Sequence, residues 1–288
     1  MNLQLLQQAI SGMKAALEHA ITTATFNGEN YDDGQEAKEA LIRSQRLIWP
    51  IHEVVKRSLA EELQRRGRQF EIHPPLDASS PELKVSGFIK GKKQDVVVLF
   101  DGDHPQPERI PDGPLAEQMD IVGRRQSERS IVVGVRSQMS SVSNNFDTLM
   151  ERAFAETLNL RLRLPGLTMG EAYVLPVVEY DDEPMNANQI GWKARPVKVS
   201  KFINTFLAIT HRAPQEIEED LYKYERSALV LVDFRPAQPR IYLRLEELQA
   251  DGLVPANFQA DFAMLSPKGF ARDLLDAHAT RHPIPRQR

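Results

Sequence analysis

Two charged side chains stand beside apolar runs in a way that could bring a carboxylate and a cation together. Asp95 lies at the entrance of a run typical of a buried strand, residues 94–100. Arg136 follows the apolar part of a second such run, residues 130–138. Carboxylate oxygens are ligands that Mg²⁺ prefers, and a guanidinium group can bind a phosphate through two hydrogen bonds. This pair of residues therefore favours chemistry on a phosphate group.

A polar loop and a helix, residues 143–156, follow the second strand. The order of a strand with an acid, a strand with a base, a polar loop and a helix resembles the core of the PD-(D/E)xK nuclease superfamily, to which most type II restriction endonucleases belong. The resemblance implies an α/β fold with a restriction endonuclease-like mixed central sheet flanked by helices. It also implies metal-dependent cleavage of double-stranded DNA, with Mg²⁺, or Mn²⁺ in its place, bound near Asp95.

The second strand departs from the family pattern. The family carries Glu-x-Lys there, and both side chains point to one face because strand side chains alternate. In this chain Gly134 stands in place of the acid and Arg136 in place of the lysine. Arginine keeps the positive charge but does not readily exchange a proton. Read strictly, this pattern is that of a catalytically inactive member of the superfamily that binds DNA or a protein partner.

A second interpretation keeps the activity. Some restriction endonucleases of this superfamily carry the acid on the helix after the strand instead. Glu151 lies 15 residues after Arg136, at the edge of the apolar face expected for that helix. The resemblance then implies that Asp95 and Glu151 bind the metal and that Arg136 stabilises the charge on the phosphate. The alternative is that Glu151 is a solvated residue on the flank of the helix.

An acid also falls on the inner face of the helix expected over residues 51–66. At about 100° per residue, Glu62 shares a face with Val55 and Leu59. A buried carboxylate must be paired, protonated or bound to metal. Nucleases of the superfamily often carry a Glu facing the site on the helix before the sheet, so the resemblance implies a catalytic role for Glu62 near Asp95. The alternative is a Glu near the helix end that pairs with an arginine.

The loop after the second strand is rich in side chains that both donate and accept hydrogen bonds. Such side chains can read bases or contact phosphates, and the loop leaves the site strand directly. The expected DNA-binding residues are Gln138, Ser140, Ser141, Asn144 and Asn145, together with Lys92 and Lys93 of a cationic turn. The alternative is that Ser143 or Asn144 caps the following helix.

The composition limits the other possibilities. The net charge of −4 gives no global basic field, so DNA must be bound by a local patch. The chain has no cysteine, which excludes disulfides and thiolate zinc sites and favours the cytoplasm. We expect no transmembrane helix and no signal peptide. No phosphate-binding glycine loop, G-x-S-x-G motif or dinucleotide fingerprint is present.

The periodicity of apolar residues predicts most elements. Helices are predicted over residues 2–24, from about residue 35 to Pro50, and over 51–66, 200–210, 245–250 and 266–279. Strands are predicted over residues 83–89, 94–100, 130–136, 170–180, 227–234 and 240–243, the first pairing with the second around a turn at Lys90–Lys93. Residues 68–81 and 101–129 are predicted to be loops, the second a long surface insertion.

We therefore expect a single nuclease-like domain over residues 1–288. Residues 1–67 would form an N-terminal helical layer, residues 68–180 the catalytic core, and residues 181–288 the rest of the sheet and its helices. The first hypothesis is a Mg²⁺-dependent restriction endonuclease acting in defence as a homodimer, because a twofold protein matches a palindromic site. The second is the inactive binding protein, and the third is an unrelated α/β fold whose carboxylates are structural.

Overall fold

A mixed β-sheet runs through the centre of the computed structural model, which describes residues 1–100, 105–215 and 217–283. Within these residues the sheet has six strands in the order β12-β11-β10-β9-β6-β3. They are β3 (Phe70–His73), β6 (Val96–Phe100), β9 (Ile131–Ser137), β10 (Thr168–Pro176), β11 (Arg226–Asp233) and β12 (Arg240–Tyr242). Strands β9, β10 and β11 are parallel, and β3, β6 and β12 pair antiparallel with their neighbours. The strand that follows Asp95 and the strand that carries Arg136 are neighbours in this sheet.

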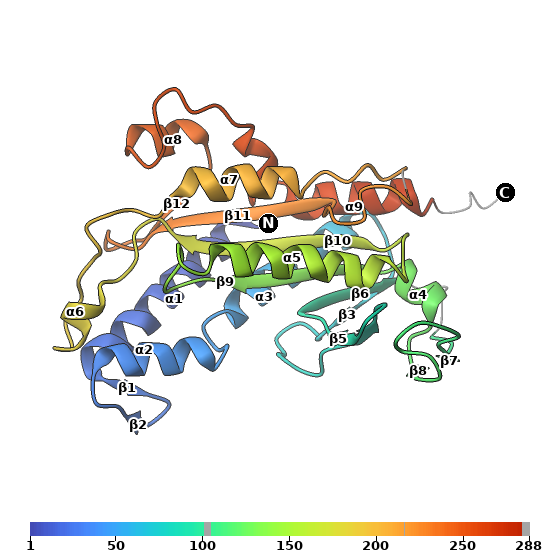
Figure 1. The fold of residues 1–288 in the computed structure, drawn as a ribbon, viewed down its shortest axis with the longest axis horizontal. Helices are drawn as coiled ribbons and strands as arrows, with labels where there is room; N and C mark the ends of the chain where they lie inside the picture. The colour runs from blue at the N-terminus through green and yellow to red at the C-terminus, as the bar shows by residue number, and fades with distance from the viewer. Residues whose placement is uncertain (101–104, 216, 284–288) are drawn as a thin grey trace.

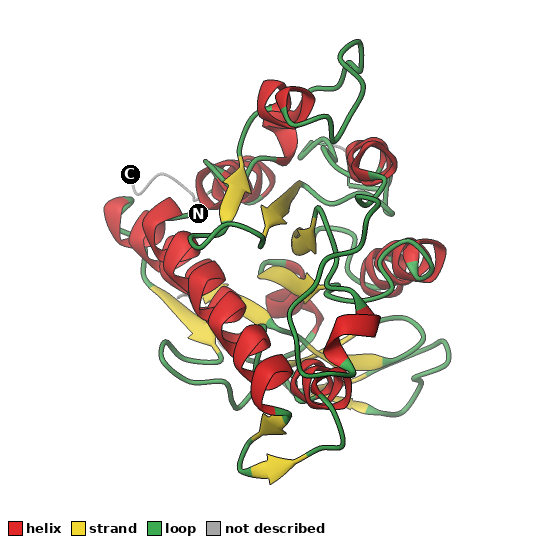
Figure 2. Ribbon diagram, turned by 90° about the vertical axis from the view of Figure 1, so that its left-hand side faces the viewer, coloured by secondary structure: helices red, strands yellow, loops and turns green. Residues whose placement is uncertain are grey.

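Helices cover both faces of this sheet (Figures 1 and 2). On one face Val96 and Val98 pack against α1 (Leu3–Thr23), α3 (Trp49–Arg65) and α9 (Phe270–Arg281). On the other face Val97 and Leu99 pack with α5 (Phe146–Arg161) and α7 (Val199–Ala208). Because the central strands are buried on both faces, they read as continuous apolar runs and not as alternating ones. The α/β class and the flanking helices agree with the prediction.

The N-terminal residues form the expected helical layer. Helix α2 (Gly34–Arg43) begins at Asp33, whose side chain accepts a hydrogen bond from the Glu36 amide. Helix α3 starts anew with Pro50 in its first turn, where the missing amide donor costs nothing. A small hairpin, β1 (Thr25–Phe26) and β2 (Glu29–Asn30), joins α1 to α2. In Figure 1 α1, α2 and this hairpin extend below the sheet on one side.

The partner of β6 differs from the predicted one. Both edges of β6 are occupied, by β9 and by β3, and β3 lies within the segment predicted to be a loop. Strand β3 has only four residues, which are too few to show an alternating pattern, and this explains the error. The segment predicted to pair with β6 instead forms a separate hairpin, β4 (Lys84–Ser86) with β5 (Gly91–Lys93), so Lys92 and Lys93 of the predicted turn lie in a strand.

The insertion between β6 and β9 is structured where the model describes it, from residue 105 onwards. It contains β7 (Glu108–Arg109), β8 (Met119–Asp120) and α4 (Arg124–Glu128). Arg163, at the end of α5, ties it to the core through ion pairs with Glu108 at 3.0 Å and with the buried Asp120 at 2.7 Å. Residues 101–104, which belong to the predicted loop, lie outside the described residues.

The C-terminal helix is held by a buried ionic cluster. The fully buried carboxylate of Glu225 contacts Arg161 at 2.5 Å, Arg281 at 2.6 Å and Arg212 at 3.5 Å, and these four side chains are 0% exposed. The remaining guanidinium donors bind backbone carbonyls, including that of Leu167. Helix α9 starts at Phe270, after Gly269, and not at Pro267 as predicted.

The remaining short elements are α6 (Asp182–Met185), α8 (Leu245–Ala250) and a 3₁₀ helix over Phe262–Leu265. Helix α8 agrees with its predicted bounds. In the part of the chain that the model describes, no helix combines the length and the apolar character needed to cross a membrane.

Candidate functional site

Three positions form one row across neighbouring strands of the sheet. Val96 of β6 pairs with Val133 of β9, so the preceding residue of β6, Asp95, stands opposite Gly134. On its other side Gly134 pairs directly with Glu171 of β10. Neighbouring strands are about 4.8 Å apart, and the middle position carries no side chain. The row therefore places two acids on either side of a gap.

Glu171 fills this gap. A Cβ atom built on Gly134 would overlap the Oε2 atom of Glu171, so the carboxylate lies over the glycine backbone where a side chain of residue 134 would be. The Glu171 side chain is 0% exposed, and neither of its oxygens has a hydrogen-bond partner among the described residues. A buried carboxylate in this condition needs a cation. The Glu171 carboxylate thus occupies the space that a side chain at position 134 would take.

Arg136 is the nearest cation. Its Nη1 atom lies 2.9 Å from Oε1 of Glu171, and its Nη2 atom binds Glu156, on the inner side of α5. Glu156 also pairs with Lys92 of β5. The guanidinium group therefore lies between two carboxylates, and Lys92 supports the outer one. These contacts hold Arg136 on the face of the sheet that α5 covers.

Burial and charge act in opposite directions on this pair. Burial raises the pKa of Glu171 to about 7, although Arg136 lowers it, and the carboxylates of Glu156 and Asp95 raise it further. Burial would lower the pKa of Arg136, but the nearby Glu171, together with Glu156 and Asp95, raises it above its ordinary value. Glu171 can therefore change its proton near neutral pH, whereas Arg136 stays charged.

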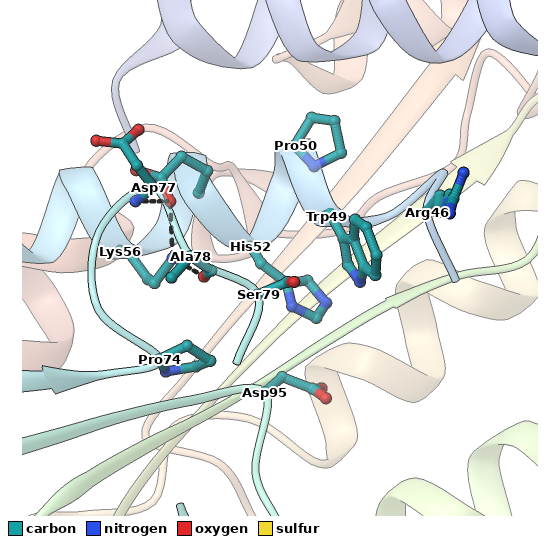
Figure 3. A pocket seen from close by; sticks show the side chains of 11 residues that line it. Arg46, Trp49, Pro50, His52, Lys56, Pro74, Asp77, Ala78, Ser79 and Asp95 are labelled. Carbon is teal, nitrogen blue, oxygen red and sulfur yellow. Dashed lines mark hydrogen bonds and ion pairs between the residues drawn. The ribbon is translucent and has the colours of Figure 1, made fainter. Parts of the chain in front are cut away.

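Asp95 lies near the Glu171–Arg136 ion pair and also lines a pocket on the α3 side of the sheet. Its Oδ2 atom accepts a hydrogen bond of 2.8 Å from the Val135 amide. The half-exposed carboxylate also lines a cavity of about 470 Å³ with His52 and Glu53, from the first turns of α3 (Figure 3). Burial lowers the pKa of His52 while Asp95 raises it. Asp95 is therefore close enough to influence both the buried acid and the open pocket.

The structure does not bring Glu62 to Asp95. Glu62 pairs with Arg66 at 2.7 Å and with Arg65 at 2.6 Å at the end of α3. It lines a different cavity, beside α9. His52 and Glu53 occupy the Asp95 pocket instead, and Glu53 lies nine residues earlier, or about 13.5 Å along the helix. The predicted position of Glu62 near Asp95 is therefore wrong, and the alternative of pairing with an arginine describes its contacts.

Glu151 does not join the acid row either. Its side chain is exposed on the outer part of α5, while Glu156, more than one helical turn later, contacts Arg136. The helix does bring a carboxylate to the site, but from a different position. The correction follows from the phase of α5: at about 100° per residue Glu151 lies about 160° from the buried Ala153, whereas Glu156 lies about 60° from it.

The predicted DNA-binding loop is exposed at the C-terminal end of β9, a strand inside the sheet. Met139 and Val142 anchor it as buried residues, and the Val142 amide donates to Oε1 of Glu179 at 3.2 Å. The residue at the start of α5 is Asn145, whose side chain makes no capping bond, so the alternative of a cap by Ser143 or Asn144 is wrong. The exposed side chains of this loop are those of Ser141, Ser143, Asn144 and Asn145.

Two further predicted residues of this group are engaged within the chain. The Gln138 side chain donates to the backbone oxygen of Ser140, and Lys92 pairs with Glu156. Lys93 is exposed on β5. The backbone of Ser141 has a φ of 50°, in the left-handed region, which helps the loop to turn away from β9.

The fit of this site to a metal ion rests on its oxygen donors. Among the described residues no three His, Cys, Asp or Glu side chains form a group that could hold a metal ion. Mg²⁺ usually takes only one or two carboxylates, and water and substrate oxygens complete its shell. Asp95 and Glu171 supply two carboxylates in the row; Oε1 of Glu171 lies 2.9 Å from Arg136, and its Oε2 has no hydrogen-bond partner among the described residues.

Sequence reasoning missed Glu171, Glu156, His52 and Glu53. A signal existed only for Glu171, since it is an acid within the otherwise apolar run of β10, Thr168–Pro176. Such a residue in a strand buried on both faces requires a partner.

Comparisons of the chain with protein-family models, with curated proteins and with solved structures found no match. The interpretation of the site therefore depends on its own geometry and chemistry.

Proposed function

We propose that the chain is a metal-dependent endonuclease that cleaves double-stranded DNA, of the restriction or defence type, with Mg²⁺ or Mn²⁺ as its metal. The observation that carries the proposal is the row of Asp95, Gly134 and Glu171 beside Arg136. It supplies two acids and a cation on neighbouring strands, the same set of groups that the superfamily draws from an Asp and a Glu-x-Lys. Gly134 is then the position that makes room for the acid of β10.

The arrangement of the sheet supports this proposal. The strand that follows Asp95 and the strand that carries Arg136 are antiparallel neighbours, and α5 packs on the face to which Arg136 points. A mixed central sheet between layers of helices is the fold that the resemblance implies. The three acids that would take part come from β10, from α5 and from the start of β6, so the site needs all of these elements in register.

Each group would have a distinct role. Asp95 and Glu171 would hold the metal ion, which supplies an activated water and neutralises charge on the phosphate. Arg136 would stabilise the charge that develops on the phosphate, because its own charge is permanent and already positioned. Glu156 would orient Arg136 through their ion pair, with Lys92 on its far side. Glu156 is therefore a positioning residue.

Duplex DNA would approach the sheet at the strand ends where Asp95 lies, before β6 and after β9. The polar loop after β9 and the exposed Lys93 of β5 lie at these strand ends and would contact bases and phosphates. A homodimer would present one such site to each of the two DNA strands, as expected for a palindromic sequence.

The test compares two site variants with one control. Asp95→Asn and Glu171→Gln should each reduce Mg²⁺-dependent cleavage of unmodified, genome-sized DNA by more than roughly 100-fold, because each removes one of two protein ligands. Glu151→Gln should cleave like the wild type, because Glu151 is exposed. Duplex binding in Ca²⁺ should persist in all three variants. Equal activity of Glu171→Gln and the wild type would contradict the role of the row.

One observation favours the second candidate, a nuclease-fold protein that binds DNA without cutting it. Arg136 is held by two carboxylates, so part of its charge is already balanced within the chain. Arginine also does not exchange a proton readily. Tight duplex binding with no cleavage by the wild type in Mg²⁺ or Mn²⁺ would establish this candidate in place of the first.

A further inference from the structure

The cavity beside Asp95 is built from two different walls. The start of α3 supplies Trp49 and His52, whose rings extend from the helix on the side where Asp95 lies (Figure 3). The segment after β3 supplies Pro74 and Ser79 on the other side. The cavity measures about 470 Å³. It is a separate space from the cavity of about 620 Å³ that Arg136 and Glu156 line on the α5 face.

The second wall is held in place by a buried lysine. The Lys56 side chain is 2% exposed, and its amine donates to the backbone oxygens of Pro75 and Ala78, both at 2.8 Å. Lys56 also pairs with Glu53 at 2.7 Å. Since these partners satisfy the amine, Lys56 shapes the cavity and leaves its ligand chemistry to other residues.

Trp49 is the unusual residue of the first wall. It is 40% exposed, although tryptophan is highly buried on average. An exposed indole that faces a cavity offers a flat surface for stacking, and nucleobases stack on aromatic side chains in single-stranded recognition. The neighbouring Arg46 is also exposed and is held over the Phe26 ring, 5.9 Å from its centroid, with a hydrogen bond to Asn27.

His52 adds a polar group in need of a partner. Its Nε2 atom is buried and makes no hydrogen bond to any described residue. A buried unpaired polar atom is costly, and the edge of a base carries both donors and acceptors that could satisfy it. Stacking on Trp49 and an edge contact to His52 can be made by one flat, polar, aromatic ligand.

We propose that this cavity binds an unstacked nucleobase of the DNA strand, stacked on Trp49 and contacted at its edge by His52, with its phosphate directed to Arg46. The inference rests on the proposed function for the identity of the strand. A duplex would have to turn this base out of its stack, which costs a few kcal/mol and is least costly at a mismatch. The pocket would thus bind the nucleotide next to the phosphate that is cut.

The experiment measures nucleotide binding without cleavage. Saturation-transfer NMR in EDTA would follow the base protons of dAMP and dCMP, with deoxyribose 5-phosphate as the probe that lacks a base. We expect base-proton signals with the wild type, and binding weakened roughly 5- to 150-fold in Trp49→Ala, which corresponds to about 1–3 kcal/mol of base stacking. Trp49→Phe should recover part of the affinity, and Trp192→Phe, which changes the other tryptophan, should bind like the wild type.

The outcomes separate the two proposals because this assay needs neither metal nor cleavage. Equal binding of dAMP by the wild type and Trp49→Ala, or equal binding of dAMP and deoxyribose 5-phosphate, would overturn the base pocket even if the protein cuts DNA. Trp49-dependent dAMP binding by a protein that does not cut DNA would support the pocket and overturn the proposed function. Circular dichroism of Trp49→Ala should match the wild type, since the side chain is exposed.

Discussion

The buried carboxylate of Glu171 should make the stability of this protein depend on pH near neutrality. Glu171 is fully buried, and burial raises its pKa from the ordinary 4.5 to about 7. The folded chain therefore binds this proton more tightly than the unfolded chain does. The contribution of protonated Glu171 to the free energy of unfolding is fully present below pH 4.5, the ordinary pKa of the group in the unfolded chain. This contribution is lost as the pH rises through 7, the pKa in the folded chain.

The magnitude follows from the two pKa values. A difference of one pKa unit corresponds to about 1.4 kcal/mol, and the difference from 4.5 to about 7 spans roughly 2.5 units. The wild type should therefore lose about 3 kcal/mol of unfolding free energy from this group between pH 4.5 and pH 8. Glu171→Gln has no such proton, so its stability relative to the wild type should rise by that amount over the same range.

Urea unfolding of both proteins at pH 4.5, 6, 7 and 8, followed by far-ultraviolet circular dichroism, measures this difference directly. Comparing the two proteins at each pH removes the contributions of all groups that the substitution leaves unchanged. A difference that is constant with pH would refute the reasoning. It would mean that Arg136 keeps Glu171 charged throughout, and that the ion pair outweighs burial.

Two further substitutions, each with a control, test the packing around the site and the C-terminal helix. Gly134→Ala should displace the Glu171 carboxylate and slow DNA cleavage roughly 100-fold, because small misplacements of catalytic groups are costly. Gly12→Ala, in open space on α1, should leave cleavage unchanged and stabilise the fold to urea by about 0.5–1 kcal/mol. Glu225→Gln should cost about 3–5 kcal/mol in urea unfolding, because it leaves three buried arginines without their shared counter-charge. Glu117→Gln, at an exposed ion pair, is its matched control and should change stability by less than about 0.5 kcal/mol.

Most of the architecture could be predicted from the sequence because its signals are local. The helical period of residues 2–24 and the Pro50 restart give α1 and α3 nearly as they are, and the apolar runs give β6, β9 and β10. The strand β3 could not be predicted, because four residues do not establish a period. The predicted strand over residues 83–89 was assigned to the wrong partner, because sequence proximity favours β6, but β3 occupies that side of β6 and β4 pairs with β5.

The site was predicted less well because it depends on the angles between elements. Asp95 and Arg136 could be located from their positions along two strands, and these strands are neighbours. Glu62 was chosen from helix phase and the resemblance, and Glu151 from its distance of 15 residues after Arg136 and its place at the edge of the apolar face. Phase gives the direction of a side chain around its helix but not which turn lies over the site. The turns that reach the site carry His52 and Glu53 on α3, and Glu156 on α5.

Under the proposed function, the acid of the motif is found by comparing neighbouring strands, at Glu171, and not along β9 alone. A motif such as Glu-x-Lys places its acid two residues before its base, so within one strand Gly134 looks like a loss. In the sheet the same point in space is also within reach of the paired residue of the next parallel strand, about 4.8 Å away. An acid at that register can extend over the site only if the position beside it has no side chain. Glycine at 134 and glutamate at 171 are therefore one feature, and a change at either position should disable the site.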